Sequence, residues 1–226
     1  DRNTYIMPVP SGYCESHVTY DATATHYLSK YDFDTMTGMF SALATDYPDY
    51  VTETLLGQDS TATYDIKSYV LESKSALSEG YTSAMQREKP VFIITSGLHG
   101  VEPDAVHMVY HFMKDLCENH MENEHLEYLK NNIKFVIVPI SNPWGYVNKN
   151  YHNSNDVDLN KNFECGYQNN GTANTGTEAY SEAETRLLKG VFDTYSNAIF
   201  HLECHGKYGE DTSFARTIWF SLMKSL

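Results

Sequence analysis

The sequence predicts an α/β fold in which helices cover both faces of a mostly parallel, mixed sheet. Three short runs rich in apolar residues predict strands at residues 91–94, 135–139 and 198–204. After the first of them, apolar residues recur at helical spacing from Pro103 to about residue 118, which predicts a helix. In sheets built from such alternating elements, ligands bind at the carboxyl ends of the strands.

The first part of the chain adds a helix and two strands. Asp34 is expected to cap a helix that runs to about Asp46. Strands are expected near residues 51–57 and 65–72, and the sequence Gly-Gln-Asp-Ser at 57–60 predicts the turn between them.

A second capping signal lies in the last third of the chain. Ser181 and Glu184 have the spacing of a capping box, which predicts a helix that runs to about Tyr195. The preceding residues, 164–180, are rich in Asn, Gly and Thr and predict a long polar loop.

A histidine and a glutamate three positions apart stand where the first apolar strand gives way to its helix. These are His99 and Glu102, in the sequence SGLHGVEPD. An imidazole and a carboxylate held in this way can supply two of the three protein ligands of a catalytic zinc ion, which leaves its fourth position for water. The alternative is a surface histidine beside a helix-capping glutamate, because so short a pattern is common by chance.

Further motifs follow in a fixed order. The second apolar strand is followed by NPWGY at residues 142–146 and by DLNKNF at 158–163, and the third strand ends at His205. With HxxE, these motifs resemble those of the zinc carboxypeptidase family, the metallopeptidases related to carboxypeptidases A and B. The resemblance extends from about Tyr31 to the end of the chain, so the α/β fold is expected to be zinc carboxypeptidase-like.

The resemblance implies a function and a set of site residues. His99, Glu102 and His205 would hold one zinc ion per chain, and Asn160 and Lys161 would bind the terminal carboxylate of the substrate. The activity implied is that of a zinc-dependent metallocarboxypeptidase, which hydrolyses C-terminal peptide bonds by metal-activated water. The expected partner is a peptide or acyl-amino-acid substrate with a free carboxylate.

The chain also departs from the family pattern. Most relatives have Arg where this chain has Lys161, which offers a point charge but no planar fork for bidentate pairing. Relatives also carry an Arg shortly before that segment; here Lys149 and His152 are both open as substitutes. The general base implied by the resemblance is a Glu several tens of residues after the third ligand, which would lie beyond Leu226. We therefore expect the natural chain to continue.

Two other functions are compatible with these motifs. An amidohydrolase related to aspartoacylase and succinylglutamate desuccinylase would share HxxE and a later histidine, although the NPWG segment and the long spacing favour the peptidase. A degenerate member would keep the fold and bind peptides without cleaving them. A second histidine pair, His107 and His111, has a spacing that can bind metal but lacks the Glu of HExxH, so we expect it to be structural.

Composition sets outer limits. A chain of 226 residues with 41% hydrophobic residues can bury one sizeable core, so we expect a lead-in over residues 1–30 and one incomplete catalytic domain over 31–226. The net charge of −14 argues against nucleic acid as a partner. No apolar run approaches the length of about 18 residues that a membrane span needs. The start at Asp1 is compatible with a removed leader, and we expect a secreted or extracytoplasmic protein.

Overall fold

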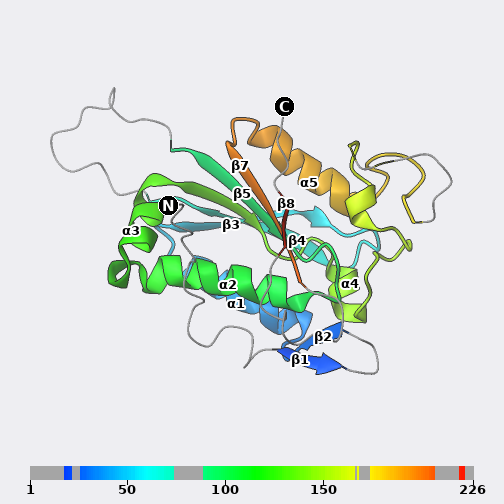
Figure 1. The fold of residues 1–226 in the computed structure, drawn as a ribbon, viewed down its shortest axis with the longest axis horizontal. Helices are drawn as coiled ribbons and strands as arrows, with labels where there is room; N and C mark the ends of the chain where they lie inside the picture. Colours follow the sequence, from blue (N-terminus) through cyan, green and yellow to red (C-terminus); the bar gives the residue numbers. More distant parts are fainter. Residues whose placement is uncertain are drawn as a thin grey trace, which may run out of the picture.

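The computed structural model describes residues 18–21, 26–73, 89–165, 167, 174–206 and 219–221. In these ranges the chain forms a two-stranded sheet and a six-stranded mixed sheet, the latter in the order β3-β4-β6-β5-β7-β8 (Figure 1). The strands are β1 (Val18–Asp21), β2 (His26–Ser29), β3 (Val51–Gln58), β4 (Asp65–Leu71), β5 (Val91–Ser96), β6 (Lys134–Val138), β7 (Phe200–His205) and β8 (Trp219–Ser221).

Described helices connect β2 to β3, β5 to β6 and β6 to β7. None of the described helices is both long and apolar enough to cross a membrane. The helices are α1 (Phe33–Asp46), α2 (Pro103–Glu118), α3 (Glu124–Asn132), α4 (Pro143–Asn148) and α5 (Ala183–Thr194), with short 3-10 turns η2 (His120–Glu122) and η3 (Leu159–Lys161).

The three predicted apolar strands form the parallel centre of the sheet. β5 pairs in parallel with β6 on one side and with β7 on the other, so that Ile94 lies opposite both Ile137 and Leu202. β3, β4 and β8 join antiparallel at the two sides. The mixed sheet is thus confirmed, and the carboxyl ends of its three parallel strands meet at one edge.

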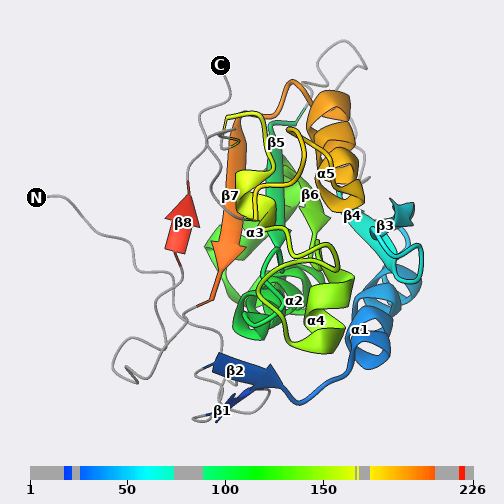
Figure 2. The ribbon, with the colours of Figure 1, turned by 90° about the vertical axis from the view of Figure 1, so that its right-hand side faces the viewer.

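Helices lie on both faces of this sheet, as the sequence predicts (Figure 2). On one face, α1 and α2 pack Phe40 and Met113 against the aromatic and β-branched residues of β5 and β6. On the other face, α5 packs Leu188 and Val191 against Ile93 of β5 and its neighbours. Burying both faces explains why these strands read as continuous apolar runs.

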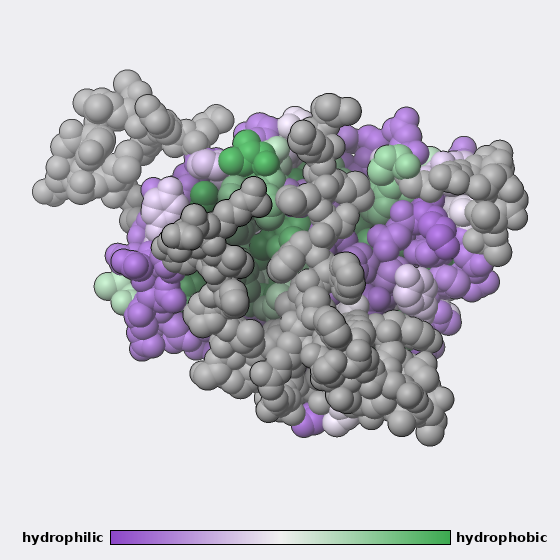
Figure 3. All heavy atoms as spheres, in the orientation of Figure 1, coloured by the Kyte–Doolittle hydropathy of each residue, from purple (hydrophilic) through white to green (hydrophobic). Residues whose placement is uncertain are grey.

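A hydrophobic area shows on the face of the molecule seen in Figure 3, over the region where β5 and β7 lie in Figure 1. Phe92 of β5 and Phe200 of β7 are both partly buried, with ring centroids 4.9 Å apart. Hydrophilic residues lie toward both sides of this area.

The predicted helix caps are wrong in detail. Helix α1 begins at Phe33, and the cap is Asp32, whose Oδ1 accepts a hydrogen bond from the Thr35 backbone N–H at 2.7 Å. Two aspartates stand two positions apart in this sequence, and only Asp32 has the extended backbone that a cap requires, whereas Asp34 lies inside the first turn.

The predicted capping box at α5 does not form. The helix begins at Ala183, after Glu182, and Ser181 donates its hydroxyl hydrogen bond to the Glu182 carboxylate. The Glu184 carboxylate accepts hydrogen bonds from the backbone N–H and the hydroxyl of Ser60 in the β3–β4 loop. Tertiary partners therefore take the side chains that the local pattern would pair with each other.

Two further expectations concern the loops and the beginning of the chain. Residues 57 and 58 belong to β3, so the predicted turn is the loop that follows, closed by a hydrogen bond from Asp59 N–H to Tyr64 O at 2.9 Å. Most of the lead-in lies outside the described residues, and its division from the rest of the chain stays a prediction. Its last strand is joined to α2 through Ser29, whose Oγ lies 2.8 Å from Nε2 of the fully buried His107.

Candidate metal site

The HxxE segment lies at the carboxyl end of β5 because glycines let the backbone turn there. Gly97 has a φ of 68°, in the left-handed region that favours glycine. A Cβ on Gly100 would lie only 1.9 Å from the carbonyl carbon of Gly145, so the loop and α4 touch backbone to backbone. Asn142 joins the same segments, since its Nδ2 donates to Leu98 O at 3.0 Å.

The Glu102 carboxylate lies between two imidazoles. Its Oε1 is 3.0 Å from Nδ1 of His99, and its Oε2 is 3.0 Å from Nδ1 of His205 at the end of β7. Among the described residues, these three are the one group of His, Cys, Asp or Glu whose ligand atoms all lie within 4.8 Å of one another. His99 and Glu102 are buried, and His205 is partly exposed.

This arrangement fits a zinc ion. Ligand atoms at the usual Zn–N and Zn–O distances lie about 3.3 Å apart around a tetrahedral centre, close to the two contacts seen here. Two imidazoles and one carboxylate are also the ligand set of several catalytic zinc sites. The Glu102 carboxylate is further held by the backbone N–H of Gly206, 3.1 Å from its Oε2.

His99 is also held from its other side, by the carboxylate of Asp158. Its Nε2 lies 3.3 Å from Oδ1 of Asp158 and 3.2 Å from Nδ2 of Asn160. Asp158 is buried, and its other oxygen lies 3.1 Å from Nζ of Lys161. A carboxylate on the outer nitrogen of a histidine fixes the tautomer whose inner nitrogen is free to bind a metal.

Charge and burial shift the pKa values of these groups. Burial opposes protonation of His99, but its hydrogen bonds to Asp158 and Glu102 outweigh burial and raise its pKa to about 9. Burial also opposes ionisation of Asp158, yet His99 and Lys161 lower its pKa to about 2. The pKa of Glu102 is lowered against the effect of burial by the two histidines. The metal-free site is therefore an ion-paired cluster.

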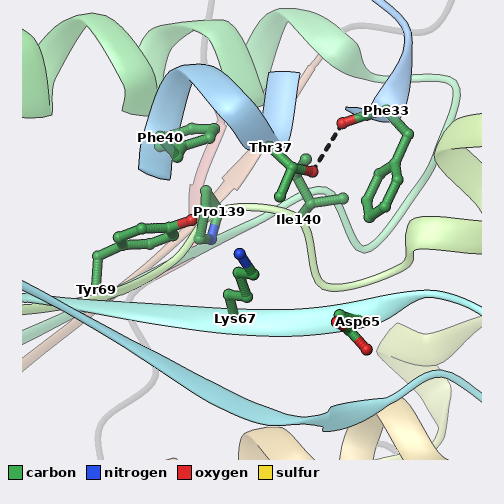
Figure 4. A pocket seen from close by; sticks show the side chains of 8 residues that line it. All are labelled: Phe33, Thr37, Phe40, Asp65, Lys67, Tyr69, Pro139 and Ile140. Carbon is green, nitrogen blue, oxygen red and sulfur yellow. Dashed lines mark hydrogen bonds between the residues drawn. The ribbon is translucent and has the colours of Figure 1, made fainter. Parts of the chain in front are cut away.

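A small cavity away from the triad lies between α1 and β4. Figure 4 shows Lys67 of β4 pointing toward α1 there, beside Tyr69 and Phe40. Lys67 pairs with Glu53, with Nζ 2.7 Å from Oε1. One carboxylate, that of Asp65, lines this cavity, and no histidine or cysteine does, so the triad is the candidate metal site.

Comparison with known families decides the class. The zinc carboxypeptidase family model matches residues 36–209, which is most of the chain and includes all three triad residues. The chain belongs to the zinc carboxypeptidase family. This result favours the peptidase over the aspartoacylase-like alternative.

Individual relatives and structures agree with the family. Carboxypeptidase O of Homo sapiens is 24% identical over 143 residues, which cover 54% of this chain and 38% of the relative. Thrombin activatable fibrinolysis inhibitor has a similar fold, with a TM-score of 0.66 at 18% identity over 79% of this chain and 48% of that one. Carboxypeptidase A from Helicoverpa armigera gives 0.61 at 23% identity, over 78% and 46%. The chain thus spans less than half the length of these relatives.

Of the two residues predicted to bind a carboxylate, Asn160 contacts the triad and Lys161 contacts Asp158. Asn160 places its Nδ2 3.5 Å from Nε2 of His205, in addition to its contact with His99. The side chain of Lys161 is 51% exposed, so its ammonium group faces solvent while it pairs with Asp158. Their binding role stays a prediction.

The two candidate substitutes for the family's upstream Arg lie differently. His152 places its Nδ1 2.7 Å from Oδ1 of Asp156. Lys149 is exposed and ends α4 in the left-handed conformation, with a φ of 53°. Among the described contacts, neither side chain meets the triad.

Sequence reasoning missed two residues of the site, Asp158 and Tyr151. The Tyr151 ring stacks on that of His99, with centroids 3.6 Å apart and planes 19° apart. Burial, with the charges of Asp158 and Glu102, raises the pKa of Tyr151 to about 12, so its ring is neutral. Asp158 is the first residue of the DLNKNF segment, and Tyr151 lies between the two candidate substitutes for Arg, Lys149 and His152. A neutral ring offers no charge to mark it as a substitute for Arg, and the resemblance implies a role for Asn160 and Lys161 but none for Asp158.

Proposed function

We propose that the protein to which this chain belongs is a zinc-dependent metallocarboxypeptidase with one zinc ion, held by His99, Glu102 and His205. The observation that supports this most directly is the position of the Glu102 carboxylate, whose two oxygens lie 3.0 Å from Nδ1 of His99 and 3.0 Å from Nδ1 of His205. When bound, such an ion lowers the pKa of water and polarises a carbonyl group.

The protein's own groups prepare the site for that chemistry. Asp158 keeps the Nε2 proton of His99, so that Nδ1 is the nitrogen that loses its proton and presents a lone pair when a metal binds. The Gly206 N–H fixes one oxygen of Glu102 at the end of β7. The Asp158 carboxylate and the Gly206 N–H are in place before substrate binds. Their hydrogen bonds offset part of the free energy that burying the charged groups of the site costs.

Substrate binding is proposed for Asn160 and Lys161. An amide donor and an ammonium group suit a terminal carboxylate, and the exposed ammonium of Lys161 is accessible to it. Lysine binds as a point charge, so we expect it to accept more varied carboxylate orientations than an arginine fork. The proton-accepting glutamate, which the resemblance places beyond Leu226, and a secreted location both stay predictions.

The test uses the natural gene product that contains this chain, loaded with zinc. It is assayed on peptides that differ in their C-terminal residue, on the same peptides with amidated ends, and on acyl-amino acids. Release of C-terminal residues from free-acid peptides alone is the expected result. Cleavage of acyl-amino acids only would favour the aspartoacylase-like function, and binding of peptides without cleavage would favour the degenerate domain.

A variant pair tests the substrate residues in the same assay. Lys161→Met is expected to raise KM for free-acid peptides, because it removes the cation that faces the carboxylate. Lys189→Met removes another exposed lysine, on helix α5, and is the matched control, for which we expect no change. Equal effects of the two variants would argue against a role for Lys161.

A further inference from the structure

Tyr151 covers one face of His99. The two rings are nearly parallel, with centroids 3.6 Å apart and planes 19° apart. The ring of His205 is farther from that of His99 and tilted, with centroids 4.8 Å apart and planes 39° apart. Tyr151 therefore makes the closest ring contact recorded for this histidine in the described part of the chain.

The other restraints on His99 act at the edge of its ring. Nδ1 contacts Glu102, and Nε2 contacts Asp158. Contacts at Nδ1 and Nε2 fix the positions of these two atoms. They oppose rotation of the ring about the line through the two nitrogens only weakly. A flat ring in van der Waals contact with the face opposes that rotation, because every displacement of the imidazole toward it meets packed atoms.

We infer that Tyr151 is a positioning residue, whose ring holds the His99 imidazole in the plane that metal binding requires. The inference rests on the proposed function, since it takes His99 as a zinc ligand. It assigns the effect to the flat ring and not to the hydroxyl group. Tyr151 thus acts on the metal through His99, as hydrogen-bonded partners of metal-binding histidines do at other sites.

Four variants of the full chain test the inference through zinc affinity, measured by competition with a chromophoric chelator. Tyr151→Ala removes the ring, Tyr151→Leu keeps an apolar side chain without a flat ring, and Tyr151→Phe keeps the ring without the hydroxyl. Tyr128→Ala is the control, because Tyr128 is 62% exposed in α3 and has no contact with the triad among the described residues. Circular dichroism of the metal-free forms shows which variants fold.

We expect Tyr151→Ala and Tyr151→Leu to weaken zinc binding by about tenfold or more, the lower end of the effect of losing a ligand's supporting partner. Tyr151→Phe and Tyr128→Ala should bind like the wild type. The visible absorption of the Co²⁺-substituted protein, which reports ligand geometry, should change in the first two variants and not in the others.

Each other result is informative. Wild-type affinity in folded Tyr151→Ala or Tyr151→Leu, while His99→Ala binds no zinc, would overturn this inference and leave the proposed function standing. Equal losses in Tyr151→Phe and Tyr151→Ala would also overturn it, because the hydroxyl would then be responsible. Absence of zinc binding in the wild type would instead overturn the proposed function.

Discussion

Asp158 holds His99 by its outer nitrogen, with Oδ1 3.3 Å from Nε2, while the inner nitrogen faces Glu102. The two residues are 59 positions apart in the chain and both are buried. This contact joins the DLNKNF segment to the HxxE segment. The two segments therefore form one site, in which Asp158 favours the His99 tautomer that carries its proton on Nε2.

Replacing this carboxylate should weaken metal binding. Asp158→Asn keeps the size of the side chain but removes the charge that favours a proton on Nε2, and we expect zinc affinity to fall by about 10-fold to 100-fold. The matched control is Asp156→Asn, because the side chain of Asp156 is 79% exposed. The backbone of this residue has a φ of 60°, which asparagine also adopts readily. Chelator competition measures both, and equal affinities would contradict the role given to Asp158.

Zinc affinity should rise with pH. In the metal-free protein the pKa of His99 is raised to about 9, so at pH 7 its imidazole carries a proton that must leave before Nδ1 can bind a metal. One released proton corresponds to about a tenfold gain in affinity per pH unit below that pKa. Titrations between pH 6 and 8 in buffers of different ionisation enthalpy measure both the affinity and the proton. An affinity that does not change over this range would contradict the ion-paired state of the metal-free site.

The stability of the metal-free protein should have the opposite dependence at high pH. The pKa of His99 is raised from 6.5 to about 9, so its contribution is fully present below 6.5 and is lost as pH rises through 9. The pKa of Asp158 is lowered from 3.8 to about 2, so its contribution is present above 3.8 and is lost as pH falls through 2. Urea unfolding should show a lower free energy of unfolding above pH 9 than at pH 6, and His99→Gln should reduce that difference.

The backbone contact behind the site should not tolerate a side chain. Gly100→Ala places a Cβ against the backbone of Gly145, and we expect it to lower the free energy of unfolding by about 1–3 kcal/mol. Gly190→Ala is the control, because a Cβ there meets nothing within 4 Å inside helix α5, and it should stabilise the protein by up to about 1 kcal/mol. Denaturant unfolding measures both. A neutral Gly100→Ala would show that the two segments are not in close contact.

Local patterns predicted much of the fold and the first part of the site. The central strands and α2 follow from apolar runs and helical spacing. His99 and Glu102 lie three residues apart between the end of β5 and the beginning of α2. The antiparallel outer strands do not follow from the alternation of strands and helices, because strand order depends on packing between distant segments. The error at Asp34 has a similar cause: two equivalent side chains compete for one cap, and backbone conformation decides.

The missed residues depend on contacts across the chain. Asp158 reaches His99 only because η3 lies beside the end of β5, and Tyr151 stacks on it from the segment that precedes η3. Neither contact has a signature in local spacing. Charge alone made Lys149 and His152 the natural candidates in that segment, yet a neutral aromatic ring is the group that meets the site.

The most direct test of the central claim is the zinc content of the purified full chain, measured by elemental analysis beside a His99→Ala variant. About one zinc per chain, lost in the variant, is the expected result, because a catalytic zinc ion takes three protein ligands and His99 is one of the three proposed. No zinc in the wild type, even after reconstitution, would contradict the claim that His99, Glu102 and His205 form a metal site.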